Sequence, residues 1–338
     1  MVVPVHNNAR EALECLTALR RALPSDSEII VVDDASTDDT PARVAATGVR
    51  VLRRARNGGP GAARNDGARA ARGTVLFFVD ADVLVAVDAP ARVLAAFDGS
   101  RDVAAVFGSY DACPRAPGLV SQYRNLLHHF VHQQGDVAAS TFWAGCGAVR
   151  RDVFVALGGF DERRFPRPSI EDIELGYRLR AAGCRILLDK NLQGTHLKRW
   201  TLRSVVRTDV TCRAIPWARL NLDRRASFTD LNLKASQRAS GALVALAFAC
   251  LLLAAVHQGF AGGAGAAAFG VVLINRDFFG FLRRRHGLAF AAACVPLHLL
   301  YFFYSGLSYA FVRLEFLLRG PAHSPTAAAV ADHRREDR

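Results

Sequence analysis

The sequence of 338 residues predicts an α/β fold built on a doubly wound, mostly parallel sheet. Short apolar segments alternate with amphipathic segments through the first hundred residues. Two of the apolar segments end in acidic residues, Asp33-Asp34 and Asp80-Ala81-Asp82. Because ligands of open parallel sheets bind beyond the carboxyl ends of the strands, these acids also mark the expected functional site.

The elements of the first hundred residues follow from apolar spacing, caps and turns. The expected strands are 2–5, 28–33, 49–53 and 74–79. A first helix is expected at 10–23, and Asp38 or Asp39 caps a second, which has Pro41 in its first turn. A loop at 57–61 opens a third helix that runs to about residue 72.

The segment 119–200 completes the first predicted domain, which covers residues 1–200. Helices are expected at 119–134, from Asp152 onward and at 171–182. The residues Gly145-Cys146-Gly147 predict a tight turn, and 186–189 is the last expected strand.

Two long segments, 239–275 and 287–312, contain no Asp, Glu, Lys or Arg. About 20 apolar residues suffice to cross a bilayer core, and buried helices of soluble proteins seldom stay uncharged for so long. We therefore predict a transmembrane region at 239–312, formed by a helical hairpin and a third span. Two spans and an interfacial segment are the alternative. With three spans, the short polar tail 313–338 lies outside the cell.

The segment 201–238 is predicted to be a basic amphipathic helix in the membrane interface. Residues 197–238 hold ten Lys or Arg against three Asp, and further arginines follow the first uncharged run. Such charge marks the cytoplasmic side of an inner membrane and attracts anionic lipids. The expected partner is a membrane and not nucleic acid. An ordinary surface helix packed on the core is the alternative.

The seven cysteines are odd in number and show no C-x-x-C spacing. This pattern argues against a disulfide framework or a zinc site and favours a reducing compartment. The sequence opens in a strand without a secretory signal peptide, and a start upstream of Met1 stays open.

Five short motifs follow one another through residues 2–200. They are Val3-Pro4-Val5-His6-Asn7, Val32-Asp33-Asp34-Ala35-Ser36-Thr37-Asp38-Asp39-Thr40, Asn57-Gly58-Gly59-Pro60-Gly61-Ala62-Ala63-Arg64-Asn65, Asp80-Ala81-Asp82 and Glu171-Asp172. In this order and spacing they resemble the family 2 glycosyltransferases, enzymes of the GT-A fold that use nucleotide sugars. The resemblance implies transfer of a hexose from a nucleotide-sugar donor with inversion of the anomeric configuration.

The resemblance also implies roles in donor binding. Asp82 would bind a divalent cation, Mg²⁺ or Mn²⁺, that bridges the donor phosphates. His196 is a second candidate ligand, and an interfacial histidine is the alternative. Nucleotide binding is implied for Pro4, His6, Asn7, Asp33, Asp34, Arg64 and Asp80. A structural turn role for Asp33 or Asp34, and an ion pair on a helix surface for Arg64, remain open.

Asp172 is the general base that the resemblance implies, with Glu171 beside it to position the acceptor. Deprotonating an acceptor hydroxyl needs a carboxylate held close to the anomeric carbon. Acids that complement a helix dipole are the alternative for this pair. Contacts to the donor or acceptor sugar are expected from Gly145, Cys146, Gly147, Arg199 and Trp200.

The sequence departs from the processive members of the family, which carry a Gln-x-x-Arg-Trp motif after the base. Here the segment is His196-Leu197-Lys198-Arg199-Trp200, so the glutamine is replaced. We therefore expect a single transfer to a lipid or lipid-linked acceptor. A processive synthase and an inactive nucleotide-binding scaffold are the alternatives. The sequence does not identify the sugar or the nucleobase of the donor. It also does not identify the acceptor or the oligomeric state.

Overall fold

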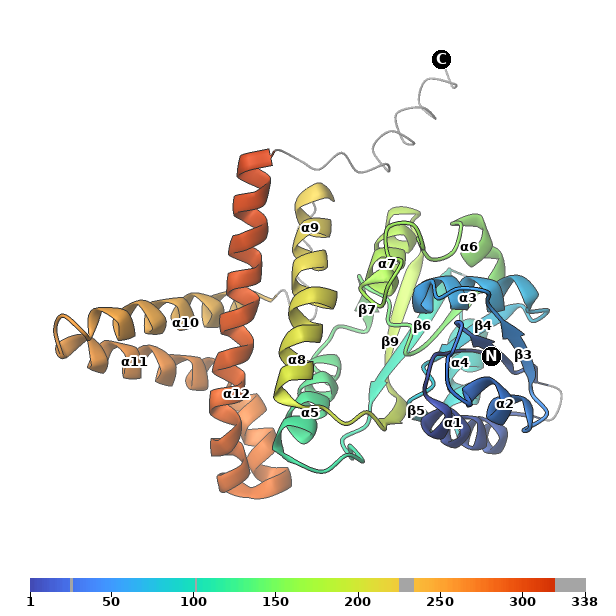
Figure 1. Cartoon of the computed structure of the whole chain (residues 1–338), viewed down its shortest axis with the longest axis horizontal. Coiled ribbons are helices and arrows are strands. Elements are labelled where there is room, and N and C mark those ends of the chain that lie inside the picture. Colours follow the sequence, from blue (N-terminus) through green and yellow to red (C-terminus); the bar gives the residue numbers. More distant parts are fainter. Residues whose placement is uncertain (25–26, 101, 225–233, 320–338) are drawn as a thin grey trace, which may run out of the picture.

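The structure is a computed structural model that describes residues 1–24, 27–100, 102–224 and 234–319. Figure 1 shows a domain of mixed sheet and helices, followed by a group of long helices at its side. The segment 313–338, expected to be a polar tail, is described only as far as residue 319.

One sheet organises the N-terminal domain, with the strand order β3-β2-β1-β4-β8-β6-β9-β5 and β7 paired to β9. The strands are β1 (Val2–Val5), β2 (Ile30–Asp33), β3 (Arg50–Arg53), β4 (Val75–Val79), β5 (Val83–Val85), β6 (Val103–Tyr110), β7 (Ala138–Ala139), β8 (Cys146–Arg150) and β9 (Arg185–His196).

The sheet is mixed, although most of its strands run in one direction. The block β3-β2-β1-β4 is parallel throughout, as expected from the alternation of strands and helices. In the other half, β8 runs antiparallel to β4 and β6, and β5 and β7 run antiparallel to β9. Strand β5 is reversed because the chain turns back at the acidic loop directly after β4, without a crossover helix.

The helices of this domain are α1 (Ala9–Ala22), α2 (Thr40–Ala45), α3 (Gly59–Ala70), α4 (Ala89–Asp98), α5 (Leu119–Gln133), α6 (Arg151–Ala156) and α7 (Glu171–Ala181). The helices expected from the sequence are present within a few residues. The segment 83–110, for which no element was predicted, forms β5, α4 and β6.

The prediction of a tight turn at 145–147 was wrong, because Cys146 and Gly147 begin β8. The glycines are required by packing and not by a turn. A Cβ on Gly147 would lie 2.2 Å from the carbonyl oxygen of Trp143, and one on Gly145 would lie 2.5 Å from the Trp143 ring.

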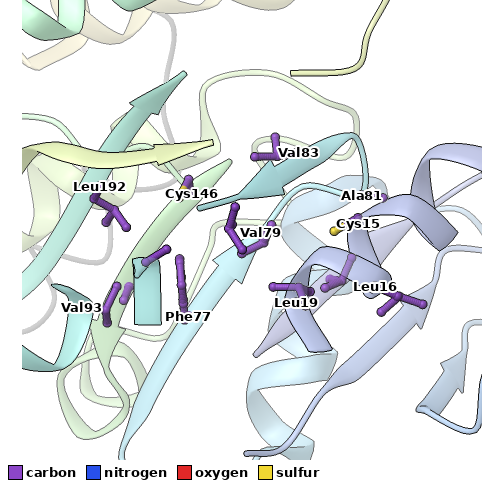
Figure 2. Close-up of a cluster of buried hydrophobic side chains, with 14 of the residues drawn as sticks. Cys15, Leu16, Leu19, Phe77, Val79, Ala81, Val83, Val93, Cys146 and Leu192 are labelled. Atoms are coloured by element: carbon purple, nitrogen blue, oxygen red, sulfur yellow. The ribbon is translucent and has the colours of Figure 1, made fainter. Parts of the chain in front are cut away.

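A buried apolar cluster holds the acidic end of β4 in place (Figure 2). Cys15, Leu16 and Leu19 of α1 pack against Phe77 and Val79 of β4. Ala81 and Val83, on either side of Asp82, belong to the same cluster and are buried. Apolar residues on both sides of Asp82, the candidate metal ligand, therefore hold the acidic loop in place.

Leu19 offers a test of this core, because its side chain is completely buried. We expect Leu19→Ala to lower the free energy of unfolding by about 2–5 kcal/mol, through lost apolar contacts and the cavity left behind. Leu94→Ala is the matched control, since Leu94 of α4 is 49% exposed. Urea unfolding of both variants measures the difference, and equal losses would contradict the role of this cluster.

The C-terminal helices are α8 (Leu202–Thr208), a π-helical stretch η1 (Asp209–Ala214), α9 (Ile215–Arg224), α10 (Ala235–Leu253), α11 (Gly259–Ile274) and α12 (Arg276–Arg319). Of the described helices, α10 and α12 are long and apolar enough to cross a membrane, and α11 is a shorter apolar helix. Helix α12 bends at Gly287, whose φ is 84°. Its first part packs on α5, where Phe278 and Leu282 meet Tyr123 and Leu126.

Candidate active site

A large cavity of about 1480 Å³ lies where the acidic ends of the strands meet the C-terminal helices. Its wall in the sheet domain includes Asp34, Asp82 and Asp172. Its opposite wall includes Arg238 of α10 and Tyr309 of α12. Residues from five separate sequence motifs and from the predicted membrane region thus line one continuous space.

Asp82 and His196 come together in this cavity. Asp82 follows β4, and His196 is the last residue of β9, so the two lie at the same edge of the sheet. The Nε2 atom of His196 is 3.4 Å from Oδ2 of Asp82. Burial favours the neutral acid, but His196 and Lys198 outweigh it and hold the pKa of Asp82 below its ordinary value.

The imidazole of His196 is held from two sides. Its ring stacks on that of Tyr110, with centroids 4.1 Å apart and planes within 7°. Its Nδ1 lies 2.6 Å from Oδ1 of Asn125 on α5. A carboxamide oxygen only accepts, so Nδ1 is the donor. In the neutral imidazole, Nε2 would then present its lone pair to a cation beside Asp82. This is the orientation in which a histidine binds a metal.

The two side chains fit a divalent cation. A carboxylate and a neutral imidazole are both ligands of Mn²⁺, and a carboxylate suits Mg²⁺. In the described part of the chain, no group of three or more His, Cys, Asp and Glu could hold a metal. A cation here would take Asp82 and His196 from the protein and its remaining ligands from water or a bound substrate.

Asn125 was not singled out from the sequence, and we predict that it positions His196 for metal binding. Asn125→Leu should weaken Mn²⁺ binding by about 10- to 100-fold, as loss of a histidine's outer partner commonly does. Asn125→Asp keeps an acceptor for Nδ1 and should bind Mn²⁺ nearly as well as the unchanged protein. Titration of free Mn²⁺ by electron paramagnetic resonance measures both. Equal affinity of the Leu variant would contradict this role.

The two acids at the end of β2, Asp33 and Asp34, have different surroundings. Asp33 is fully buried and accepts a hydrogen bond from the Ser36 amide at 3.2 Å, and it does not line the cavity. Asp34 lines the cavity and accepts from the amides of Gly58 and Gly59 at 3.0 and 2.8 Å. Asp33 therefore shapes the turn, while Asp34 ties that turn to the start of α3.

The first motif lies beside this turn. Pro4 and His6 line the cavity, and Nδ1 of His6 lies 2.9 Å from the Asp34 carbonyl oxygen. Asn7 is exposed, does not line the cavity and accepts a hydrogen bond from the Thr37 amide at 2.8 Å. Of these three, Pro4 and His6 are thus placed where a ligand could touch them.

Arg64 of α3 is a buried link between two acidic motifs. Its guanidinium donates to Asp80 at 2.6 Å and to Glu171 at 2.9 Å, and Arg64 is 4% exposed. All three residues line the cavity. The sequence left open a surface ion pair for Arg64. The structure instead buries Arg64, whose two ion pairs join the end of β4 to the start of α7. Through this ion pair, Glu171 holds the first turn of α7, which carries Asp172, next to Arg64.

Asp172 is half-buried on the cavity wall, at the first turn of α7. Its Oδ2 accepts a hydrogen bond from the Ala144 amide at 3.1 Å. Burial and the neighbouring Glu171 carboxylate raise the pKa of Asp172 to about 7, against the opposing charge of Arg64. A carboxyl group with a pKa near neutral can take up and release a proton at physiological pH.

The candidate sugar-binding residues differ in whether they line the cavity. Trp200 is buried and lines the cavity, and Nζ of Lys198 lies 4.3 Å from the centre of its ring. Arg199 is exposed and does not line the cavity. Gly145, Cys146 and Gly147 do not line it either.

Comparison with known proteins supports the sequence pattern. Residues 1–158 match the model of glycosyl transferase family 2. Validoxylamine A glucosyltransferase of Streptomyces hygroscopicus subsp. limoneus is 31% identical over 230 residues, which cover 57% of this chain and 50% of that protein. The succinoglycan biosynthesis protein ExoO of Rhizobium meliloti is 37% identical over 102 residues, 29% of each chain. The chain therefore spans half or less of the length of these relatives.

A solved structure shows the same fold. The mannosyltransferase PcManGT from Pyrobaculum calidifontis, in complex with GDP-Man and Mn²⁺, matches with a TM-score of 0.55 at 18% identity. The match covers 91% of this chain and 86% of the mannosyltransferase. Together with the family model, this likeness identifies a GT-A fold in which residues 1–158 carry the family pattern. Residues 1–158 are thus similar to glycosyl transferase family 2.

Proposed function

We propose that this chain is an inverting, cation-dependent glycosyltransferase that moves one sugar from a nucleotide-sugar donor to a lipid or lipid-linked acceptor. The observation that carries the proposal is the shared cavity, in which Asp82, His196 and Asp172 face helices α10 and α12. The donor and the cation are supported by the mannosyltransferase of the same fold, which was solved with GDP-Man and Mn²⁺.

The donor would lie between the nucleotide turn and the acidic loop. Asp34 and His6 line the cavity on the side of the nucleotide turn, and Asp82 with His196 would hold the cation. The bound cation supplies positive charge that stabilises the departing diphosphate. Arg64 keeps Asp80 and Glu171 in place through its two ion pairs. Among these residues, Asp82 and His196 carry the metal role, and Arg64 acts through its neighbours.

Asp172 would act as the base. The acceptor hydroxyl gives its proton to the Asp172 carboxylate, and its oxygen forms a bond to the anomeric carbon. The bond from that carbon to the phosphate oxygen breaks, and the nucleoside diphosphate leaves with the electron pair. One base and one displacement invert the anomeric configuration and leave no covalent intermediate on the protein.

The location at the cytoplasmic face of an inner membrane is part of the proposal. It is supported by the two long apolar helices and by the arginines that flank them. The seven cysteines are free, as expected in a reducing compartment. A lipid acceptor that stays in the bilayer could reach the cavity between α10 and α12, whose side chains line it.

The pKa of Asp172 predicts how transfer depends on pH. Because only the ionised carboxylate accepts a proton, the rate at saturating metal and donor should rise as pH increases through about 7. The protonated acid prevails below this value, where transfer should slow about tenfold for each pH unit. Initial rates between about pH 6 and pH 8 measure this limb. A flat profile over that range would contradict the assignment.

The direct test is release of nucleoside diphosphate from a panel of UDP-, GDP- and dTDP-sugars by the purified full-length protein. We expect at least one donor to be hydrolysed or transferred with Mn²⁺ or Mg²⁺, and the activity to stop with a chelator. Absence of cation-dependent turnover with every donor, in the presence of a bacterial lipid extract as acceptor, would overturn the proposal.

A further inference from the structure

The hairpin formed by α10 and α11 packs on α12 through residues that include Val244 and Phe248 of α10 and Val271 of α11. Figure 1 shows the hairpin projecting sideways from the middle of α12, across its length. Val244, early in α10, and Val271, late in α11, pack on Phe302 in one buried cluster. The tip of the hairpin, around residues 254–258, lies far from that contact.

The surface of the hairpin is apolar from its base to the tip. Residues 239–275 contain no charged side chain. Helices of 19 and 16 residues are about 28 and 24 Å long, close to the 30 Å of a hydrocarbon core. The large side chains exposed along it are Leu246, Phe248, Leu251, Leu252, Leu253, Val256, Phe260, Phe269, Leu273 and Ile274.

Helix α12 continues this apolar surface as a stripe along one face. Leu299 and Phe303 pack at the hairpin base, and the Phe303 ring lies 5.0 Å from that of Phe248. Spacings of three or four residues extend this face. Its further members, all more than half exposed, are Leu307, Phe311, Leu314 and Leu318. We call these four residues the α12 stripe.

Other positions of α12 include residues that are covered by protein or carry charge. Phe302, Ser308 and Val312 are buried. Glu315 pairs with Arg219 of α9 at 2.9 Å, which fastens the C-terminal part of α12 to the domain side. The apolar stripe and the apolar hairpin therefore lie on the side of α12 that turns away from the sheet domain.

We propose that the hairpin penetrates a lipid bilayer while α12 lies along the bilayer surface with its stripe in the lipid. The two cannot both run along the bilayer normal, because the hairpin lies across α12. Arg276 at the hairpin base and Arg283, Arg284 and Arg285 in α12 would meet anionic headgroups. Arg319 then stays on the side of the catalytic domain, in contrast to the third span expected from the sequence.

This arrangement rests on the membrane association in the proposed function and explains how the cavity reaches the lipid. The cavity is lined by Tyr301, Ser305 and Phe316, which lie on the domain side of α12, away from its stripe. A helix lying in the interface keeps this wall level with the headgroups along its length. A spanning α12 would carry part of the same wall into the hydrocarbon core.

Depth measurements with nitroxide labels test the proposal. The full-length protein, with Cys113, Cys184, Cys212 and Cys250 replaced by serine, is reconstituted in phosphatidylcholine–phosphatidylglycerol vesicles. Single labels are placed by Leu307→Cys, Phe311→Cys, Leu314→Cys and Leu318→Cys on the stripe, and by Leu246→Cys and Leu253→Cys on α10. Val155→Cys on α6, at a residue 58% exposed, is the aqueous control. Oxygen and nickel-chelate relaxation report the depth of each label.

We expect the four stripe labels to lie at one shallow depth, and the label at 253 to lie about 10 Å deeper than that at 246. Stripe labels that change depth steadily by about 16 Å from 307 to 318 would show a spanning α12 and overturn the proposal. Shallow α10 labels would overturn it too. So would stripe labels that are shielded from lipid and broadened by neighbouring spins, because a second copy would then cover the stripe.

The measurement needs neither donor nor acceptor. Membrane arrangement and enzymatic activity are therefore separated. An inactive protein with the expected depth profile would contradict the proposed function alone, and an active one with a spanning α12 would contradict only this inference.

Discussion

Replacing Asp172 with Asn should remove sugar transfer while leaving nucleotide binding nearly unchanged. The carboxamide fills the same space but cannot accept a proton, and a positioned base contributes about 10²- to 10⁴-fold to a rate. Asp172 lines the cavity at the start of α7 with a pKa near 7, whereas Asp34 lies directly after β2, at the nucleotide turn. Initial transfer rates and calorimetric titration with the nucleoside diphosphate measure the two properties separately.

The control for this variant is Asp152→Asn, at an exposed carboxylate in the first turn of α6. It should transfer sugar like the unchanged protein. Joint loss of transfer and nucleotide binding in the Asp172 variant would assign that residue to folding or binding. Retained transfer would place the base elsewhere.

Replacing Asp82 with Asn should abolish cation-dependent transfer, because the proposed cation site loses its carboxylate ligand. Asp82 is one of the two proposed protein ligands, and Lewis-acid assistance to a leaving diphosphate is worth several kcal/mol. We expect transfer to fall by at least about 100-fold and the affinity for Mn²⁺ to fall with it. Manganese titration and transfer rates at increasing Mn²⁺ concentrations measure both.

Asp88→Asn is the matched variant, because Asp88 follows β5 outside the cavity and pairs with Arg92. Its metal affinity and transfer rate should not change. Full transfer by the Asp82 variant in the presence of a chelator would show that the reaction does not use this ligand.

The sequence correctly predicted the elements whose apolar spacing matches the face that they bury in the fold. The strands that end at Asp33 and Val79 are buried apolar runs, and α1 has the apolar spacing of a helix packed on a sheet. Within the segment 83–110, strand β5 was missed because it has only three residues and no periodicity can be recognised over that length. The reversal of β8 is a matter of topology, which spacing does not encode.

The candidate site was predictable as a set of residues but less so as a set of contacts. Asp82 and His196 do meet, 114 positions apart in the sequence, because Val83, the residue after Asp82, pairs with His196 in the sheet. Asn125 could not be found, because only the packing of α5 brings its carboxamide to His196. Likewise, the spacing of Arg64 predicts a helix face but not the two carboxylates that surround it.

The membrane region shows the same limit. Uncharged length predicts that a helix can enter a bilayer, and the structure contains such helices at α10 and α12. The length of an apolar helix does not show how that helix is oriented relative to its neighbours or to the bilayer. Only the packing of Val244 and Val271 on Phe302 shows that the hairpin lies across α12.

The central claim is that one cavity brings a nucleotide-sugar donor to an acceptor held in the membrane. It is tested most directly by following a radiolabelled sugar from the donor that the panel identifies. Membranes containing the protein are incubated with this donor and Mn²⁺, then extracted with chloroform and methanol. We predict that the label enters the organic phase with the unchanged protein and not with Asp172→Asn. Label that is transferred but stays wholly in water-soluble products would contradict the account.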